Sequence, residues 1–80
     1  MKTIDVKELI KEFKHKMQEK GWTYEDGYKI AMCAESEQAI KLFGSIESSY
    51  EYVLLAMPKY DNPMQFFSDF AHMLIPDNIL

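Results

Sequence analysis

The 80-residue sequence predicts a small all-α protein, a four-helix bundle that forms a single domain over residues 1–80. Two observations support this fold class. Apolar residues recur every three or four positions in four successive segments, which is the period of an amphipathic helix. Each segment is also bounded by residues that commonly start or stop helices. The four predicted helices cover residues 5–20, 24–43, 46–57 and 63–74.

The first predicted helix, residues 5–20, has a marked start and a marked end. Asp5 and Glu8 are three residues apart, as in a capping box that satisfies free backbone N–H groups. Gly21 follows the helix as a C-terminal cap, because this position favours a left-handed backbone. The apolar stripe between them consists of Val6, Leu9, Ile10, Phe13 and Met17.

The second predicted helix, residues 24–43, begins with Thr23 and Asp26 as caps and ends at Gly44. One of its faces carries a single acid, Glu35. An acid on an apolar face must be paired or hydrogen-bonded, so we expect it to meet a lysine of the first helix or a tyrosine hydroxyl. The apolar residues of that face are Tyr24, Tyr28, Ala31, Met32, Ala39, Leu42 and Phe43.

The last two predicted helices also have cap signals at both ends. Ser45 caps residues 46–57 and Pro58 stops them, while Asn62 and Pro63 start residues 63–74. The last helix is unusual because its apolar residues fill an arc of roughly 200°, about twice the stripe that a surface helix needs.

An alternative α+β fold fits the middle of the chain. Residues 22–24, 28–34 and 50–57 would then form a three-stranded antiparallel sheet packed on helices, because 28–34 alternates like a strand and 50–55 has high strand propensity. A strand needs a partner, so the two ambiguous segments change together. The helical interpretation is preferred since each of its boundaries has a cap signal.

Composition argues against several classes of function. The net charge is −4, and all nine basic residues are lysine. Arginine is the residue best suited to phosphates and guanine edges, so its absence lowers the odds of a nucleic-acid binder or a phosphate-handling enzyme. The single cysteine, Cys33, and the lack of a signal-like apolar run predict a reducing, cytoplasmic setting.

A metal-like pattern occurs twice but on the wrong faces. Helical di-iron proteins use an acid three residues before a histidine on two helices and a further acid on each of the other two. Here both histidines fall on the polar side of their predicted helices, so we expect a solvated surface and no metal or other cofactor. The residues of this pattern are Glu12 with His15, Asp69 with His72, and Glu35 with Glu47 or Glu51.

Cys33 is a candidate nucleophile if His15 or His72 serves as its base and Glu35 orients that base. No residue pattern around Cys33 resembles a nucleophile motif, and cysteine is more often a small buried apolar residue. The sequence therefore predicts a protein without catalytic activity.

The main functional prediction is a small acidic protein that works by binding another protein, as inhibitors, immunity proteins and phage-encoded modulators do. The chain has more large apolar side chains than a bundle of this size needs in its core, so we expect an interface with a partner or with a second copy in a homodimer. Acids at the rim would tune specificity. The predicted interface consists of Tyr52, Leu55, Phe66, Phe70 and Met73, with Glu47, Glu51 and Asp69 at its rim.

The rival prediction is a helix-turn-helix regulator that binds DNA. Two helices joined at residues 43–45 would form the motif, and residues 46–57 would be the recognition helix. Against it stand the negative net charge and a recognition helix with two acids and no basic residue.

Overall fold

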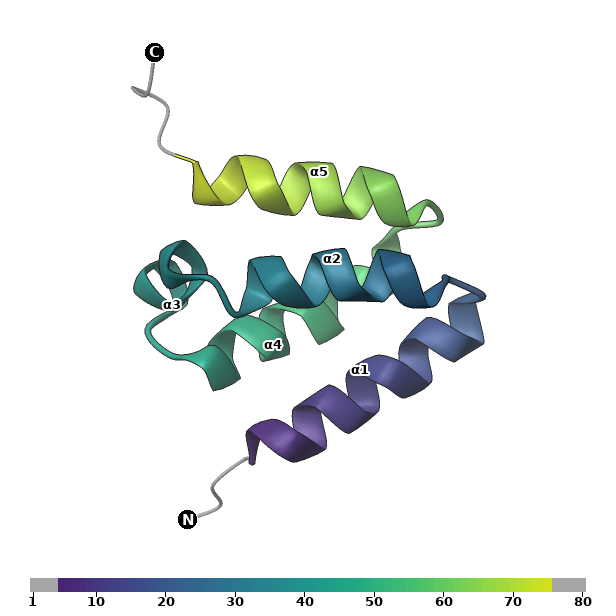
Figure 1. The fold of residues 1–80 in the computed structure, drawn as a ribbon, viewed down its shortest axis with the longest axis horizontal. Helices are drawn as coiled ribbons and strands as arrows, with labels where there is room; N and C mark the ends of the chain where they lie inside the picture. The colour runs from purple at the N-terminus through teal and green to yellow at the C-terminus, as the bar shows by residue number, and fades with distance from the viewer. Residues whose placement is uncertain (1–4, 76–80) are drawn as a thin grey trace.

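The computed structural model describes residues 5–75 and shows an all-α fold (Figure 1). Within this range there are five α-helices, one short 3₁₀ turn and no strand, so the predicted fold class is confirmed and the sheet alternative is not supported. The elements are α1 (Val6–Lys20), α2 (Tyr24–Ala34), α3 (Glu37–Phe43), α4 (Ile46–Ala56), the 3₁₀ turn η1 (Met57–Lys59) and α5 (Pro63–Leu74).

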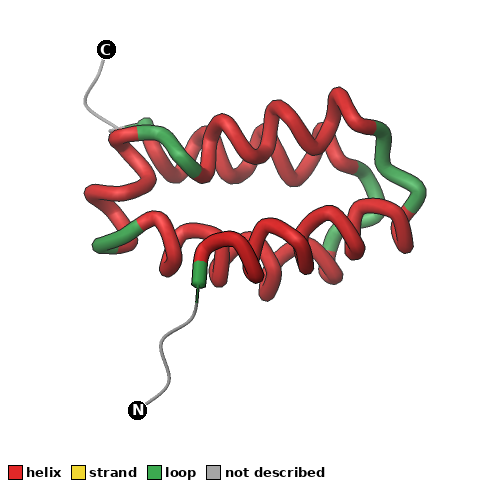
Figure 2. Tube along the Cα trace, turned by 60° about the horizontal axis from the view of Figure 1, so that its bottom comes forward, coloured by secondary structure: helices red, strands yellow, loops and turns green. Residues whose placement is uncertain are grey.

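The helices form a flat molecule only 19 Å thick along its shortest axis, with α4 near its centre. α4 contacts α1, α2 and α3, whereas α5 packs on α2 and α3. Figure 2 shows the helices joined by short loops, and in Figure 1 α1 and α2 diverge from their shared corner. The core side chains are Leu9, Phe13, Met17, Trp22, Ile30, Ala34, Tyr50, Val53, Ala56, Met57, Phe66 and Phe70.

Side-chain caps start the helices where the sequence predicts them. The Asp5 carboxylate accepts a hydrogen bond from the backbone N–H of Lys7, and Asn62 caps α5 in the same way. Thr23 and Asp26 form a reciprocal capping box at the start of α2. These bonds satisfy N–H groups that have no partner inside the helix.

The predicted helix over residues 24–43 is divided into α2 and α3, which differs from the sequence prediction. The break lies at Ser36, whose backbone is extended at ψ 158°. Its hydroxyl donates to the carbonyl of Cys33 at 2.7 Å and accepts from the backbone N–H of Ala39 at 3.2 Å. One serine side chain therefore ends α2 and starts α3. Serine favours such breaks because its hydroxyl can bond to nearby backbone groups that would otherwise bond within a continuous helix.

The break also leaves the carbonyl of Ala34 without a partner inside the helix. This carbonyl lies in the core and therefore needs a hydrogen-bond donor from elsewhere. The hydroxyl of Ser49 on α4 supplies it at 2.7 Å. Ser49 is fully buried, and among residues 5–75 it is the one polar residue in the core. This hydrogen bond attaches the C-terminal end of α2 to the centre of the molecule.

α2 packs through two small residues and Ile30, and it turns three of its large residues outward. Gly27 and Ala34 are buried together with Ile30, and a Cβ added at Gly27 would lie 2.5 Å from the methyl carbon of Met17. The large residues are exposed instead, with Tyr24 at 84%, Tyr28 at 56% and Met32 at 58% of their accessible surface. The small face lies against α4 and against the Met17 side chain of α1, and this packing fixes which residues of α2 remain outside.

The corner between α1 and α2 holds the single tryptophan of the chain. Trp22 is buried against Phe66 of α5, with ring centroids 6.3 Å apart. The ammonium group of Lys20 lies 5.2 Å from the tryptophan ring centroid, within the range of a cation–π contact. The corner is thereby joined to α5.

We predict that Ser49→Ala destabilises the fold by about 1–3 kcal/mol, because it leaves the buried carbonyl of Ala34 without a donor. Urea denaturation followed by circular dichroism measures this change. Ser68→Ala is the matched control, since Ser68 is exposed on α5 and its loss should change stability by less than about 0.5 kcal/mol. Equal effects of the two substitutions would contradict the role of Ser49.

Candidate functional site

The structure corrects two residues of the predicted interface. Phe66 and Phe70 have exposed fractions of 1% and 0%, so both belong to the core and neither is available to a partner. Their rings stack with centroids 5.7 Å apart, Tyr60 packs on Phe66, and Phe43 packs on Phe70. The wide apolar arc of α5 is therefore largely used inside the molecule, because α5 packs on α2 and α3 and on this aromatic cluster.

The other three apolar residues of the predicted interface lie at the surface. Leu55 is 75% exposed and Met73 is 43% exposed. The half-buried Tyr52 lies against Met73, with its hydroxyl 3.1 Å from the methionine sulfur, and its ring stacks on Phe43 at 5.0 Å. We call Tyr52, Leu55 and Met73 the α4–α5 face.

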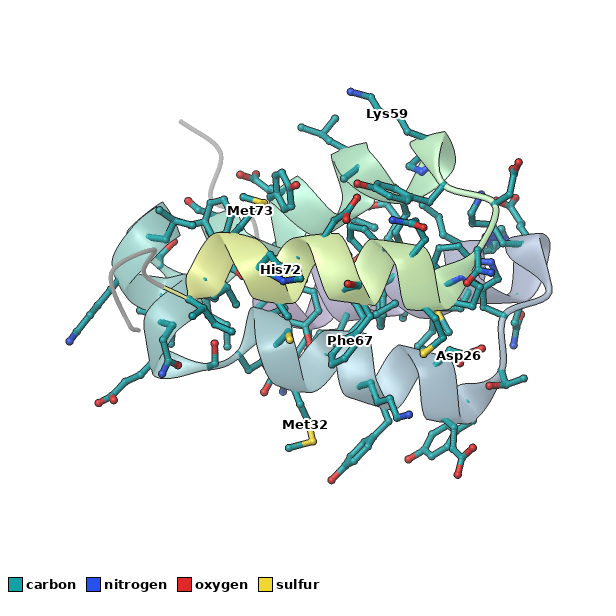
Figure 3. The ribbon with its side chains drawn as sticks, turned by 90° about the horizontal axis from the view of Figure 1, so that it is seen from above. Asp26, Met32, Lys59, Phe67, His72 and Met73 are labelled. Carbon is teal, nitrogen blue, oxygen red and sulfur yellow. The ribbon has the colours of Figure 1, made fainter. Side chains whose placement is uncertain are left out.

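Acidic residues accompany this face. Glu51 adjoins Tyr52 in the chain, and Glu47 lies one turn earlier on α4; both are half-buried. Asp69 on α5 accepts a hydrogen bond from the Tyr60 hydroxyl at 2.7 Å. That bond raises the pKa of Tyr60, because it stabilises the protonated phenol. Lys59 lies on the same side of α5 as Met73 (Figure 3).

A second apolar surface lies on the opposite side of the molecule. Tyr24, Tyr28 and Met32 are spaced four residues apart along α2, and the two tyrosine rings stack at 6.4 Å. Figure 3 shows Met32 and Met73 pointing to opposite sides, so this surface faces the viewer in Figure 1. We call these three residues the α2 face.

Sequence reasoning missed the α2 face because it treated these residues as one face of a longer helix. The signal that indicates them is the spacing of Gly27 and Ala34, two small residues seven positions apart on the face that packs closely. Small residues at helical spacing allow a close helix approach, and the large residues must then lie elsewhere on the helix.

Beside the α2 face, a groove of about 550 Å³ separates α1 from α2. Phe13 and Met17 of α1 and Tyr50 of α4 contribute to its apolar lining. Its lining includes two charged residues, Lys14 on α1 and Glu35 at the end of α2. We call this cavity the α1–α2 groove.

Glu35 is held in position by a tyrosine, as the sequence predicts. The Tyr50 hydroxyl donates a hydrogen bond of 2.5 Å to one carboxylate oxygen of Glu35. Burial of Tyr50 raises the pKa of its phenol well above the ordinary value, and the bond to Glu35 raises it further. The carboxylate therefore has a fixed place at the groove.

Cys33 lies in a smaller groove of about 420 Å³ between α2 and α5, together with Phe67 and Leu74. The thiol is half-buried, and burial raises its pKa, which lowers the thiolate fraction at neutral pH. His15 lies 3.8 Å from Glu19, and His72 contacts the carbonyl of its own helix. The structure therefore brings neither histidine to the thiol as a base.

The acid-x-x-His pairs are likewise not assembled. His15 lies next to Glu19 rather than Glu12, and His72 and Asp69 have different hydrogen-bond partners. Across residues 5–75, no group of three or more histidine, cysteine or acidic side chains is placed to hold a metal ion.

The proposed recognition helix of the DNA-binding alternative lies at the centre of the fold. α4 contacts three other helices, and Leu55 is its only exposed residue. Its sequence contains no lysine or arginine. Such a helix presents no basic or exposed polar side chain to a DNA groove.

Two further findings concern the helices of residues 5–75 and the likeness of the chain to known proteins. None of their helices combines the length and the apolar character needed to cross a membrane. Comparisons with protein-family models, with curated proteins and with solved structures find no match to this chain.

We predict that Phe70→Ala destabilises the protein by about 3–5 kcal/mol, because it removes a buried aromatic ring and leaves a cavity. Met73→Ala on the same helix removes a 43% exposed side chain and should cost less than about 1 kcal/mol. Thermal and urea denaturation distinguish the two variants. A small effect of Phe70→Ala would mean that Phe70 is not in the core.

We also predict a pH dependence for the Tyr50–Glu35 bond. Burial and, secondly, the bond to Glu35 raise the pKa of Tyr50 above its ordinary value of 10.0, so the protonated phenol stabilises the fold fully below pH 10 and progressively less as pH rises above it. Tyr50→Phe should destabilise the protein by about 1 kcal/mol at neutral pH. The difference between the two proteins should shrink above pH 10, as measured by urea denaturation at each pH.

All other ionisable groups are present in both proteins, so their contribution cancels in the difference. A difference that does not change between pH 8 and pH 11 would contradict this prediction.

Proposed function

We propose that this protein is a small acidic, non-catalytic module that works by binding another protein through its α4–α5 face. The observation that carries the proposal is the contact between Tyr52 of α4 and Met73 of α5, with the exposed Leu55 three residues after Tyr52 on α4. Aromatic residues and methionine at the centre of such a surface are typical of protein interfaces.

The central residue of this face is held in its conformation before any partner arrives. Tyr52 stacks on Phe43, packs at 5.6 Å from Phe70, and has its hydroxyl on Met73. A side chain that is already ordered loses little rotamer freedom on binding, so more of its contact energy contributes to affinity. Leu55, which is 75% exposed, then adds an apolar contact one turn along α4.

The charges near the face favour a basic partner. Glu47, Glu51 and Asp69 are all acidic, and Lys59 lies on the same side of α5 as Met73 (Figure 3). Two copies of such a face would place like charges opposite one another, which disfavours self-association here. A partner with lysine or arginine around an apolar centre fits better, and the classes of protein proposed are inhibitors, immunity proteins and phage-type modulators. The single thiol suits a reducing, cytoplasmic setting.

Affinity capture from the native host tests this proposal. The wild-type chain should retain a specific protein that Leu55→Asp does not, because the new acid is placed at the centre of the apolar contact. Gln38→Asp is the matched control and should not affect capture, since it adds the same charge at an exposed residue that lines the α2–α5 groove and belongs to neither apolar face.

The captured protein is then purified and titrated with both variants by calorimetry. We expect Leu55→Asp to weaken the complex at least tenfold and the affinity to fall as salt increases. Equal affinity of the wild type and Leu55→Asp would overturn the assignment of this face. Catalytic turnover of any captured or added substrate would overturn the non-catalytic function.

A further inference from the structure

We propose that the α2 face and the α1–α2 groove dock a second copy of this chain as a two-fold symmetric dimer. In this arrangement α2 of each copy enters the groove of the other, and α1 and α2 of both copies form a four-helix interface. The inference is independent of the proposed function, because it uses the opposite side of the molecule.

The first argument is shape. A two-fold interface uses the same patch on both copies, so the patch must be complementary to itself. Here the exposed side chains of Tyr24 and Tyr28 form the α2 rim of a groove of about 550 Å³, and Met32 continues this ridge along α2. Rotation about an axis between ridge and groove brings each ridge over the partner's groove, where its aromatic side chains meet an apolar lining.

The second argument is charge. Lys14 and Glu35 are the two charged residues that line the groove, one on each wall. A surface that carries both signs can oppose itself, whereas a surface with one sign cannot. In the dimer Glu35 of one copy faces the α1 wall of the other, where Lys14 lies, and symmetry repeats that pair. Glu35 is already oriented by Tyr50, so its carboxylate needs little reorganisation to accept the ammonium group.

The third argument is the overall shape of the chain. The α2 face lies on one of the broad sides of a molecule that is 19 Å thick and extends 37 and 34 Å in its other directions. A standard interface buries about 800 Å² per partner, roughly one seventh of the 5773 Å² that this chain exposes. A broad side of this slab is large enough for such an interface.

Light scattering of the purified chain over a wide concentration range tests the dimer. The expected mass is twice the 9.4 kDa of one chain. Tyr28→Ser should raise the dimer dissociation constant at least tenfold, with the helical circular dichroism signal retained because Tyr28 is exposed. Leu55→Ser, on the other side, should leave the dimer unchanged. A wild-type monomer at all concentrations would overturn the proposal, as would a dimer that only Leu55→Ser dissociates.

A mixing experiment tests the paired charges directly. Lys14→Glu and Glu35→Lys should each weaken their own homodimer at least tenfold, because each places like charges together in both symmetric pairs. Mixed in equal amounts, the two variants should form a heterodimer, since both of its pairs are again of opposite sign. Native mass spectrometry identifies that species.

If Glu35→Lys does not fold, Glu35→Gln retains an acceptor for Tyr50 and should weaken the dimer by charge removal alone. Homodimers of unchanged affinity in both charge variants would overturn the pairing of Lys14 with Glu35, and absence of the heterodimer would do the same.

Discussion

The hydrogen bond from Ser49 to the carbonyl of Ala34 is the contact on which the arrangement of the helices depends. It satisfies the backbone carbonyl at the end of α2. That carbonyl is buried, and buried carbonyl groups need a hydrogen-bond partner. With that carbonyl satisfied by α4, the chain can turn at Ser36 and start α3 in a new direction. α3 then packs on α4, and α5 is left to cover α2 and α3.

The helices were predictable because their signals are local. Side-chain caps such as Asp5, Thr23 and Asn62 act on N–H groups two or three residues away, so the sequence contains the whole interaction. The break at Ser36 was not predictable in the same way. Besides the local bonds of Ser36, the break needs a hydrogen-bond donor for the carbonyl of Ala34. That donor comes from Ser49, fifteen residues further along the chain than Ala34.

The candidate interface was only partly predictable for a related reason. The helical wheel of α5 shows that its apolar residues fill a wide arc. It does not show how many other helices pack against that arc. Phe66 and Phe70 meet aromatic rings from α3, α4 and the corner after α1, so they are buried. Met73, near the end of the same helix, lies against the Tyr52 hydroxyl and stays 43% exposed.

The α4–α5 face and the surface formed by the α2 face and the α1–α2 groove differ in the charges near them. Acids predominate near the α4–α5 face, whereas the α1–α2 groove has one charge of each sign on facing walls. If α2 instead turned its large residues inward, Gly27 and Ala34 would face solvent and there would be no ridge beside the groove. The close packing of a glycine against Met17 therefore also determines the outer surface.

The position of Trp22 makes its intrinsic fluorescence a probe of the structure. The indole is the only one in the chain, and it is enclosed by Phe66 with the Lys20 ammonium beside it. Its fluorescence therefore reports whether the α1–α2 corner is seated on α5, without an attached dye. Separation of that corner from α5 would admit water to the indole and shift its emission to longer wavelength, even with every helix intact.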